Sequence, residues 1–315
     1  MTYKKVTLLF NSYVDLEQFR RHYFTKLVKK ISFVLYGQSQ KKNQLYFYVD
    51  KIIECSDSDV LNFLSTVKYK KIKIESVDEV LDWKFSTNNE LKFQILKRAV
   101  AMMSYIVEKS SYFELDIREQ DLAVESILMD IASVNKYGPE FGYLSFLSNI
   151  KYFESQVKAV FSSADTTRVM NAINDLTVYD SVDFDKKPYR DLKGIEYLEE
   201  ILFLLEKYQD KIDYVGLPDP NAFFSNAKIK MEYSDFHKNF YTDYYLIERY
   251  KKTWFLNYRI LMSVIMGIFP LLNISLNRRN KIINLFVKHI EASYSISWDE
   301  QLKKIKEENH DNNKK

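Results

Sequence analysis

The hydrophobic pattern of the chain changes near Trp83, and this change limits the fold more than any other feature of the sequence. Before Trp83, short apolar runs alternate with polar breaks, and apolar side chains in Asp15–Lys30 recur at helical spacing. The short runs predict four β-strands, at Val6–Phe10, Ile31–Tyr36, Leu45–Val49 and Lys71–Ser76. A strand, a helix and two further strands in this order predict an α+β module in residues 1–83.

After Trp83 the apolar residues recur mainly at the spacing of helices. The segments that predict helices are Leu91–Lys109, Glu119–Asn135, Ser145–Phe161, Asp165–Asn174, Gly194–Gln209, Tyr233–Met266 and Ser275–Tyr294. The sequence therefore predicts an α+β fold, with an N-terminal strand-helix-strand-strand module and a mainly helical C-terminal half. We assign residues 84–302 to this helical part, which we expect to carry the active site, and residues 303–315 to a charged, disordered tail.

Composition argues against several classes of chemistry. The 315 residues include one cysteine, Cys55, and four scattered histidines, so the chain cannot form an internal disulfide or assemble a zinc site. It has no G-x-G-x-x-G, P-loop, G-x-S-x-G or H-E-x-x-H motif, and we expect no cofactor and no metal. Pro270 and Asn273 interrupt the apolar stretch Ile260–Leu276, which predicts a buried helix rather than a membrane span. These features predict a cytoplasmic protein.

Three segments, taken in order, resemble the lantibiotic dehydratase C-terminal family of thiopeptide biosynthesis. In Phe24–Val49 a helix leads to a strand, a polar turn and a second strand, which read SFVLYGQSQKKNQLYFYVD in this chain. Tyr137–Phe153, YGPEFGYLSFLSNIKYF, resembles a glycine loop that leads into a site helix, and Phe269–Trp298 is similar to the terminal helix of the family. The resemblance extends over most of the chain and implies a protein that modifies a ribosomally made peptide.

The chain departs from this family in one strand. Stand-alone members that eliminate glutamate need arginines to hold its carboxylate, whereas this chain has Tyr46, Phe47 and Tyr48 there. The departure points to the pyridine synthase branch, whose members join two dehydroalanines of a thiazole-bearing peptide by a formal 4+2 aza-cycloaddition and expel water and the leader peptide. An aromatic strand suits such a flat, neutral substrate. The resemblance thus implies a cyclase or lyase that needs no cofactor.

The implied chemistry needs groups that donate and accept protons, and a way to bring two alkenes together. His237 and Tyr241 are four residues apart and share a helical face, although an aromatic packing stripe has the same spacing. Tyr143 and Ser145 follow the glycine loop, which would expose them unless it is a simple turn. The catalytic candidates are Tyr143, Ser145, His237, Tyr241, Arg259 and His289, and the substrate-binding candidates are Tyr46, Tyr48, Arg249 and Arg278. For His289 and the arginines, pairing with a carboxylate is the structural alternative.

Residues 1–75 are rich in lysine, which predicts a docking face for an acidic leader peptide. The leader-binding candidates are Lys26, Lys29, Lys30, Lys41 and Lys42. The expected partner is a precursor peptide with a leader and a dehydrated, thiazole-bearing core, and other modification enzymes are further candidates. Two other functions stay open: a non-catalytic peptide-binding scaffold, and a basic aromatic protein that binds single-stranded nucleic acid. The net charge of only +3 argues against nucleic acid.

Overall fold

The computed structural model describes residues 3–30, 33–39, 43–50, 57–77, 87–175, 190–214, 234–241 and 243–312. The chain forms two compact units, each built from segments that are separated in the sequence. Unit 1 comprises Met1–Leu115, Glu200–Asp213 and Leu261–Ser275, and unit 2 comprises Asp116–Glu199, Tyr214–Ile260 and Leu276–Lys315. An independent N-terminal module over residues 1–83 stays a prediction.

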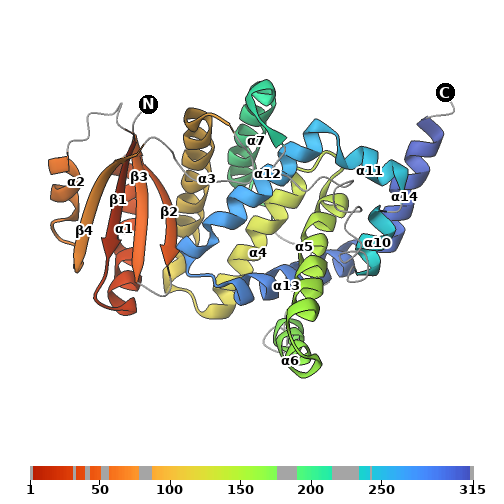
Figure 1. Cartoon of the computed structure of the whole chain (residues 1–315), viewed down its shortest axis with the longest axis horizontal. Helices are drawn as coiled ribbons and strands as arrows, with labels where there is room; N and C mark the ends of the chain where they lie inside the picture. Colours follow the sequence, from red (N-terminus) through yellow and green to blue (C-terminus); the bar gives the residue numbers. More distant parts are fainter. Residues whose placement is uncertain are drawn as a thin grey trace. The chain divides into compact units, whose positions relative to one another are not determined.

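Unit 1 contains a four-stranded antiparallel sheet in the order β2-β3-β1-β4 (Figure 1). Its strands are β1 (Tyr3–Leu9), β2 (Phe33–Ser39), β3 (Gln44–Asp50) and β4 (Lys71–Val77). Strand β1 lies between β3 and β4, and its Val6 is opposite Phe47 on one side and Ile74 on the other. Val6 and Phe47 are completely buried and, as directly opposed residues, lie on the same face of the sheet. The predicted succession of strand, helix, strand and strand along the chain and the α+β class are confirmed.

Three helices accompany the sheet in unit 1: α1 (Tyr13–Lys30), α2 (Asp57–Leu64) and α3 (Asn89–Ser110). Helix α3 begins after Asn88, whose side chain accepts a hydrogen bond from the amide of Leu91, and the helix packs against α1 and β2. Tyr3 of β1 stacks on Phe93 of α3, with ring centroids 5.2 Å apart. The sheet and α3 therefore share one aromatic core.

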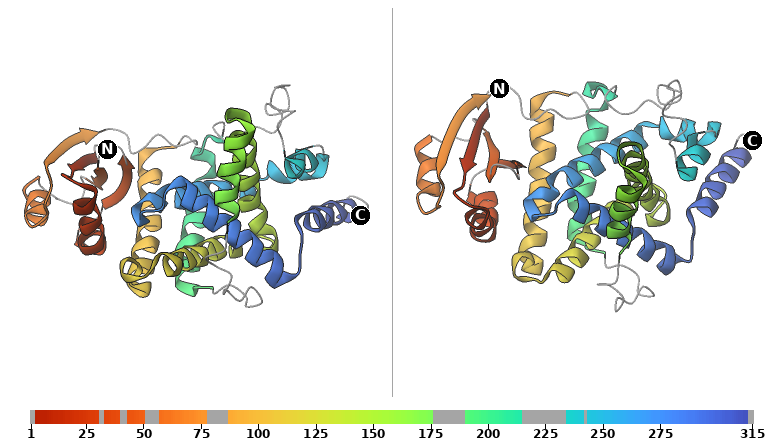
Figure 2. Two further views of the ribbon diagram at one scale, coloured as in Figure 1. Left: turned by 90° about the horizontal axis from the view of Figure 1, so that it is seen from below. Right: turned by 60° about the horizontal axis from the view of Figure 1, so that its bottom comes forward.

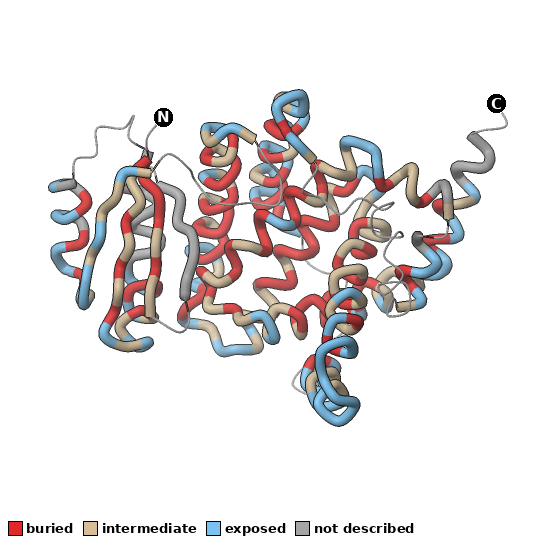
Figure 3. The backbone as a smooth tube through the Cα atoms, in the orientation of Figure 1, coloured by how far each residue is buried: buried red, intermediate tan, exposed pale blue. Residues whose placement is uncertain are grey.

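Unit 2 is helical in its described residues. Its helices are α4 (Ile117–Ser133), α5 (Pro139–Val160), α6 (Ser163–Asn174), α10 (Asp235–Tyr241), α11 (Tyr244–Tyr250), α13 (Leu276–Tyr294) and α14 (Trp298–Asn312). Helices α4, α5 and α13 pack against one another as its centre (Figures 1 and 2), and buried residues run along all three (Figure 3). Helix α6 contacts α5 and α13, while α10 contacts α5, α11 and α14. This packing places α4, α5 and α6, which are all distant from α13 in the sequence, against that one helix.

The turn between α4 and α5 depends on two glycines. Gly138 has a φ of +85°, which favours glycine, and Pro139 then occupies the first helical position of α5. A Cβ atom on Gly142 would lie 2.3 Å from the carbonyl oxygen of Ala132, so α4 and α5 approach too closely for a side chain there. Because α5 begins at Pro139, Tyr143 lies inside the helix and is completely buried. The prediction that a glycine loop exposes Tyr143 is therefore wrong.

Two predicted segments differ from the structure. The segment predicted as one helix, Tyr233–Met266, contains three, namely α10, α11 and most of α12. Asp243 accepts a hydrogen bond from the amide of Leu246 and so begins α11 as an N-cap, which separates α11 from α10. The tail predicted to be disordered is helical up to residue 312, because Leu302 and Ile305 bury one face of α14.

Two long helices, α7 (Leu192–Lys207) and α12 (Thr253–Ile268), each contain a boundary between the units. The short 3-10 helices are η2 (Tyr112–Glu114), η4 (Gln209–Lys211) and η6 (Phe269–Leu272). By length and composition, the stretch Thr253–Leu272 could cross a membrane, but 67% of its apolar window is buried inside the protein. This burial is that of a core helix, as the sequence predicts.

Candidate active site

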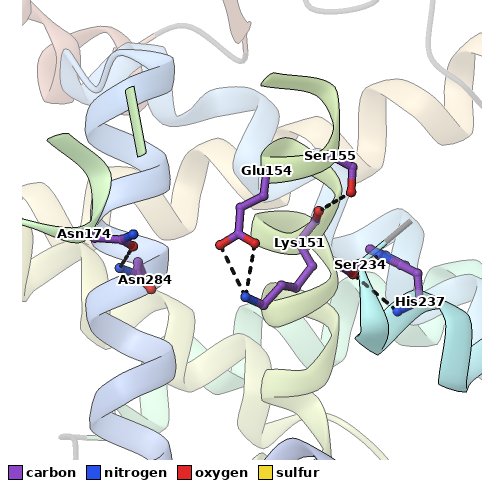
Figure 4. Close-up of polar contacts among 7 residues, drawn as sticks. All are labelled: Lys151, Glu154, Ser155, Asn174, Ser234, His237 and Asn284. Atoms are coloured by element: carbon purple, nitrogen blue, oxygen red, sulfur yellow. Dashed lines mark hydrogen bonds and ion pairs between the residues drawn. The ribbon is translucent and has the colours of Figure 1, made fainter. Parts of the chain in front are cut away.

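His237, in the first turn of α10, is held between two serines. Its Nε2 lies 3.0 Å from the hydroxyl of Ser148 on α5. Its Nδ1 lies 2.9 Å from the hydroxyl of Ser234, a contact drawn in Figure 4. The Ser234 hydroxyl also accepts a hydrogen bond from the backbone amide of His237, 3.4 Å away, as an N-cap does. Ser234 therefore begins the helix and orients the imidazole at the same time.

Burial determines the protonation state of His237, which is only 3% exposed. Because a buried imidazolium would lose its hydration, burial lowers the pKa of His237 to about 4, and the nearby Lys151 ammonium contributes to this decrease. At neutral pH the ring is therefore neutral, with one N–H donor and one acceptor nitrogen. With a hydroxyl at each nitrogen, such a ring can pass a proton from one serine to the other.

The Lys151 ammonium acts electrostatically on His237 and on Glu291, a carboxylate of another helix, while its own ion-pair partner lies on α5. Lys151 lies one turn after Ser148 on α5, and its Nζ is 3.1 Å from Oε2 of Glu154 (Figure 4). The Lys151 ammonium lowers the pKa of both His237 and Glu291, the latter on α13. One partly exposed cation thus influences the protonation of two groups that are remote in the sequence.

Tyr143 and Glu291 form a second pair that can carry protons. Tyr143 donates its phenol hydrogen to Oε1 of Glu291, across 3.4 Å. Burial raises the pKa of Tyr143, and the Glu291 carboxylate raises it further, so the phenol stays protonated. Burial also raises the pKa of Glu291, against the lowering effects of the Tyr143 hydrogen bond and of Lys151. A carboxyl group whose pKa is raised in this way is suited to general acid–base chemistry.

We call Tyr143, Ser148, Lys151, His237 and Glu291 the α5 cluster, because three of the five lie on that helix. The cluster offers hydroxyl groups, a neutral imidazole, a carboxyl group and one fixed cation, which together can donate and accept protons. Among the residues that the structure describes, no group of three or more His, Cys, Asp or Glu side chains could hold a metal ion.

Two of the predicted catalytic residues, His289 and Arg259, pair with groups outside the α5 cluster. His289 is buried on α13, where its Nδ1 is 2.6 Å from Oε1 of Glu125 on α4. Ser145 is half-buried on α5, one turn before Ser148 on the same side of the helix. The structure therefore brings Tyr143 and His237 into the α5 cluster, places Ser145 one turn from Ser148 and pairs His289 with a carboxylate of α4.

The predicted arginines lie in three other places in unit 2. The Arg249 guanidinium of α11 stacks on the ring of Tyr137, 3.5 Å from its centroid. The Arg259 guanidinium of α12 lies 4.5 Å from the centroid of the Tyr250 ring and contacts the hydroxyl of that tyrosine. Arg278, near the start of α13, donates from Nε to a buried carboxylate of α4 at 2.6 Å. The first two are cation–π contacts, and the third is an ion pair.

Of the predicted aromatic wall on β3, only part is open to solvent. Tyr46 and Tyr48 are in edge-to-face contact, with ring centroids 6.2 Å apart. Tyr48 is buried, whereas Tyr46 is half-buried and has the Lys5 ammonium 4.6 Å from its ring centroid. The side chains of six further candidates lie outside the residues that the structure describes: Tyr241, Lys26, Lys29, Lys30, Lys41 and Lys42.

Sequence reasoning missed four residues that the structure places at the site: Ser148, Lys151, Ser234 and Glu291. Ser234 had a local signal, because a serine three residues before a helical residue has the spacing of an N-cap. Ser148 and Lys151 lie three residues apart in the segment that resembles a site helix. They can be recognised as site residues only after α10, which carries His237, has packed on α5.

Comparison with known proteins agrees with the fold but offers little sequence similarity. No protein-family model matches the chain, and no curated protein matches its sequence. Among solved structures, TsrL superposes with a TM-score of 0.60 at 14% identity, over 97% of this chain and 99% of TsrL. TbtD, a pyridine synthase from thiomuracin biosynthesis, superposes with a TM-score of 0.57 at 10% identity, over 94% of this chain and 100% of TbtD. The resemblance predicted from the sequence is therefore confirmed in the fold, and this chain has the fold of the pyridine synthase TbtD.

Proposed function

We propose that this chain is a cytoplasmic enzyme of thiopeptide maturation that forms a pyridine-centred macrocycle. Its substrate would be a ribosomally made, thiazole-bearing peptide in which two dehydroalanines react by a formal aza-cycloaddition, with loss of water and of the leader peptide. The observation that carries the proposal is the superposition on TbtD over 100% of that chain.

The α5 cluster has the groups that this reaction needs. An amide reacts as its imidic tautomer, so a proton must leave the nitrogen and another must reach the oxygen. Ser148 and the neutral imidazole of His237, 3.0 Å apart, are suited to this exchange. Loss of water during aromatisation then needs a proton donor, and the Glu291 carboxyl, whose pKa is raised, is suited to supply it with Tyr143 beside it.

Much of the rate would come from holding the two alkenes together. Correct placement of two reacting groups lowers a barrier by up to about 7–11 kcal/mol in ideal cases. A protein that supplies placement and a few proton carriers therefore needs no reactive prosthetic group.

The proposal is tested by incubating the purified chain with a synthetic peptide that carries a leader, a thiazole and two dehydroalanines, followed by mass spectrometry. We expect loss of the leader and of one water, together with a new pyridine absorbance. Ser148→Ala should slow the reaction by about tenfold or more, because it removes one partner of the imidazole. Ser155→Ala is the matched control, since the Ser155 hydroxyl bonds to the Lys151 carbonyl of its own helix.

One result would contradict the proposed reaction, and another would contradict only its assigned site. An unchanged mass with tight peptide binding would indicate a non-catalytic scaffold. Equal rates for wild type and Ser148→Ala, with macrocycle formed, would keep the reaction and remove the α5 cluster as its site.

A further inference from the structure

A cleft of about 460 Å³ lies in unit 2, where the first turns of α4 and α13 meet α6. It shares no residue with the α5 cluster. Its volume is in the range of sites that accept small molecules or a few side chains of a peptide.

The lining of this cleft carries more positive than negative charge. Arg168, Arg278 and Lys281 line it together with one carboxylate, Asp121, which leaves two positive charges in excess. Arg278 is 2.6 Å from the Asp121 carboxylate and 3.1 Å from the side-chain oxygen of Gln120, so it is held in place and its charge is matched. The other two cations of the lining are Arg168 and Lys281. The Arg168 side chain is 83% exposed, and its 3.7 Å contact with a neighbouring aspartate of α6 is that of a weak surface pair.

The remaining walls of the cleft are apolar. Val169, Ala172 and Ile173 of α6 line it opposite Ile117 of α4. Ile117 is 68% exposed, and Leu276, which precedes the lining residues of α13, is 55% exposed. Two large apolar side chains thus stand in water at the rim of a cationic cleft. A small inorganic anion would pair with the cations but leave this surface uncovered, whereas an acidic peptide with apolar side chains would satisfy both.

We propose that this cleft docks an acidic, leucine-bearing segment of the precursor peptide, and for the identity of the peptide the proposal rests on the proposed function. Carboxylates of the segment pair with Arg168 and Lys281, and its apolar side chains cover Ile117, Ala172 and Val169. The docking site thereby moves from the N-terminal lysines that the sequence suggested to α6 and α13.

The geometry of α13 links this cleft to the α5 cluster. Lys281 and Glu291 are ten residues apart on the same helix, which corresponds to about 15 Å along its axis. An extended peptide covers that distance with about five residues. A substrate whose acidic segment is docked in the cleft can therefore reach the α5 cluster with a short spacer, and a much shorter spacer would prevent it from reaching.

The test uses fluorescence anisotropy with the full chain and a fluorescein-labelled synthetic peptide in which Glu-Asp pairs alternate with leucine. We expect Arg168→Glu combined with Lys281→Glu to weaken binding by about tenfold or more, because two attractive charges become repulsive. Ala172→Trp should weaken it by a similar factor without changing charge, because the indole fills the cleft. The matched control is Lys158→Glu combined with Lys304→Glu, two exposed lysines of α5 and α14 whose reversal changes the net charge equally and should have almost no effect.

Several results would overturn the inference. If wild type does not bind the peptide, or if the control pair weakens binding as much as the cleft pair, the cleft is not a specific site. If Ala172→Trp binds normally while inorganic phosphate displaces the peptide, the cleft takes a small anion instead. Circular dichroism of each variant confirms that it is folded.

The cyclisation assay separates this inference from the proposed function. The labelled sequence is placed as the leader of the dehydroalanine substrate, and the rate is compared at low substrate concentration. Normal cyclisation by the cleft variants would overturn the inference and leave the proposed function intact. Peptide binding without any cyclisation by wild type would overturn the proposed function, and with it the identity of the peptide, but not the cleft as an acidic-peptide site.

Discussion

Unit 2 buries two histidines with opposite surroundings. His289 has the Glu125 carboxylate 2.6 Å from its Nδ1, whereas His237 has a serine hydroxyl near each nitrogen and the Lys151 ammonium in its vicinity. A carboxylate favours a charged imidazole, while burial and an ammonium favour a neutral one. Burial alone therefore does not distinguish the two histidines. The groups beside them do, and they suggest a structural role for His289 and a proton-transfer role for His237.

The largest expected effect concerns activity. His237→Ala should lower the rate of macrocycle formation by about 100-fold or more, because a general acid–base group typically contributes that much. His289→Ala, corrected for the folded fraction, should lower the rate only a few fold. Single-turnover mass spectrometry measures both rates, and circular dichroism gives the folded fraction. Equal losses in the two variants would erase the proposed difference between the histidines.

The next largest effect concerns stability. Glu125→Ala should lower the free energy of unfolding by about 3 kcal/mol, because it removes the carboxylate that lies beside the buried His289 imidazole. Ser148→Ala should cost about 1 kcal/mol, since it removes one hydrogen bond of a neutral imidazole. Urea denaturation monitored by circular dichroism gives both values. A larger loss of unfolding free energy for Ser148→Ala than for Glu125→Ala would contradict a structural role for His289 and a proton-transfer role for His237.

A pH dependence of similar size follows from the neutral state of His237. Its pKa is about 4 in the folded chain and 6.5 in the reference state, so between these values the unfolded chain binds more protons. The stability contributed by the neutral ring is therefore fully present above about pH 6.5 and is lost as the pH falls towards about 4. The pKa difference corresponds to about 3 kcal/mol. Urea unfolding of wild type and His237→Gln across this window should show a flatter curve for the variant, and parallel curves would argue against a buried neutral imidazole.

The smallest effect sharpens the role of Lys151. Lys151→Met removes the ammonium that lowers the pKa of both His237 and Glu291, so both pKa values should rise. The rise for His237 should be small, because burial is the larger cause of its shift. An NMR titration of the imidazole and carboxyl carbons measures the two values, with Lys158→Met, an exposed position of the same helix, as control. Unchanged values in Lys151→Met would remove Lys151 from the α5 cluster.

The fold could be predicted from the sequence where its signals are local. The strands β1 to β4 overlap the predicted runs, because each run is a short apolar or alternating stretch between polar breaks and can be recognised within itself. The start of α5 was placed too late, since Gly142 was interpreted as part of a turn although it belongs to a helix. The division of Tyr233–Met266 was missed because aromatic residues hide the capping signal of Asp243.

The candidate site could be predicted only in part. Tyr143 and His237 were identified from the types of residue in short segments. Their partners were not, because Ser148 and His237 are 89 positions apart and Tyr143 and Glu291 are 148 apart. The contacts that define the α5 cluster exist only after α10 and α13 have packed on α5, and no pattern in a single segment encodes them.

The close approach of α4 and α5 at Gly142 has a consequence for the evolution of this chain. Even a methyl group at that position would meet the Ala132 carbonyl, so a substitution there would force α5 away from α4. Because α5 carries Tyr143, Ser148 and Lys151, that displacement would move all three relative to His237 and Glu291. Lineages that keep this helix crossing should therefore retain a glycine at that position, even where drift has replaced almost everything around it.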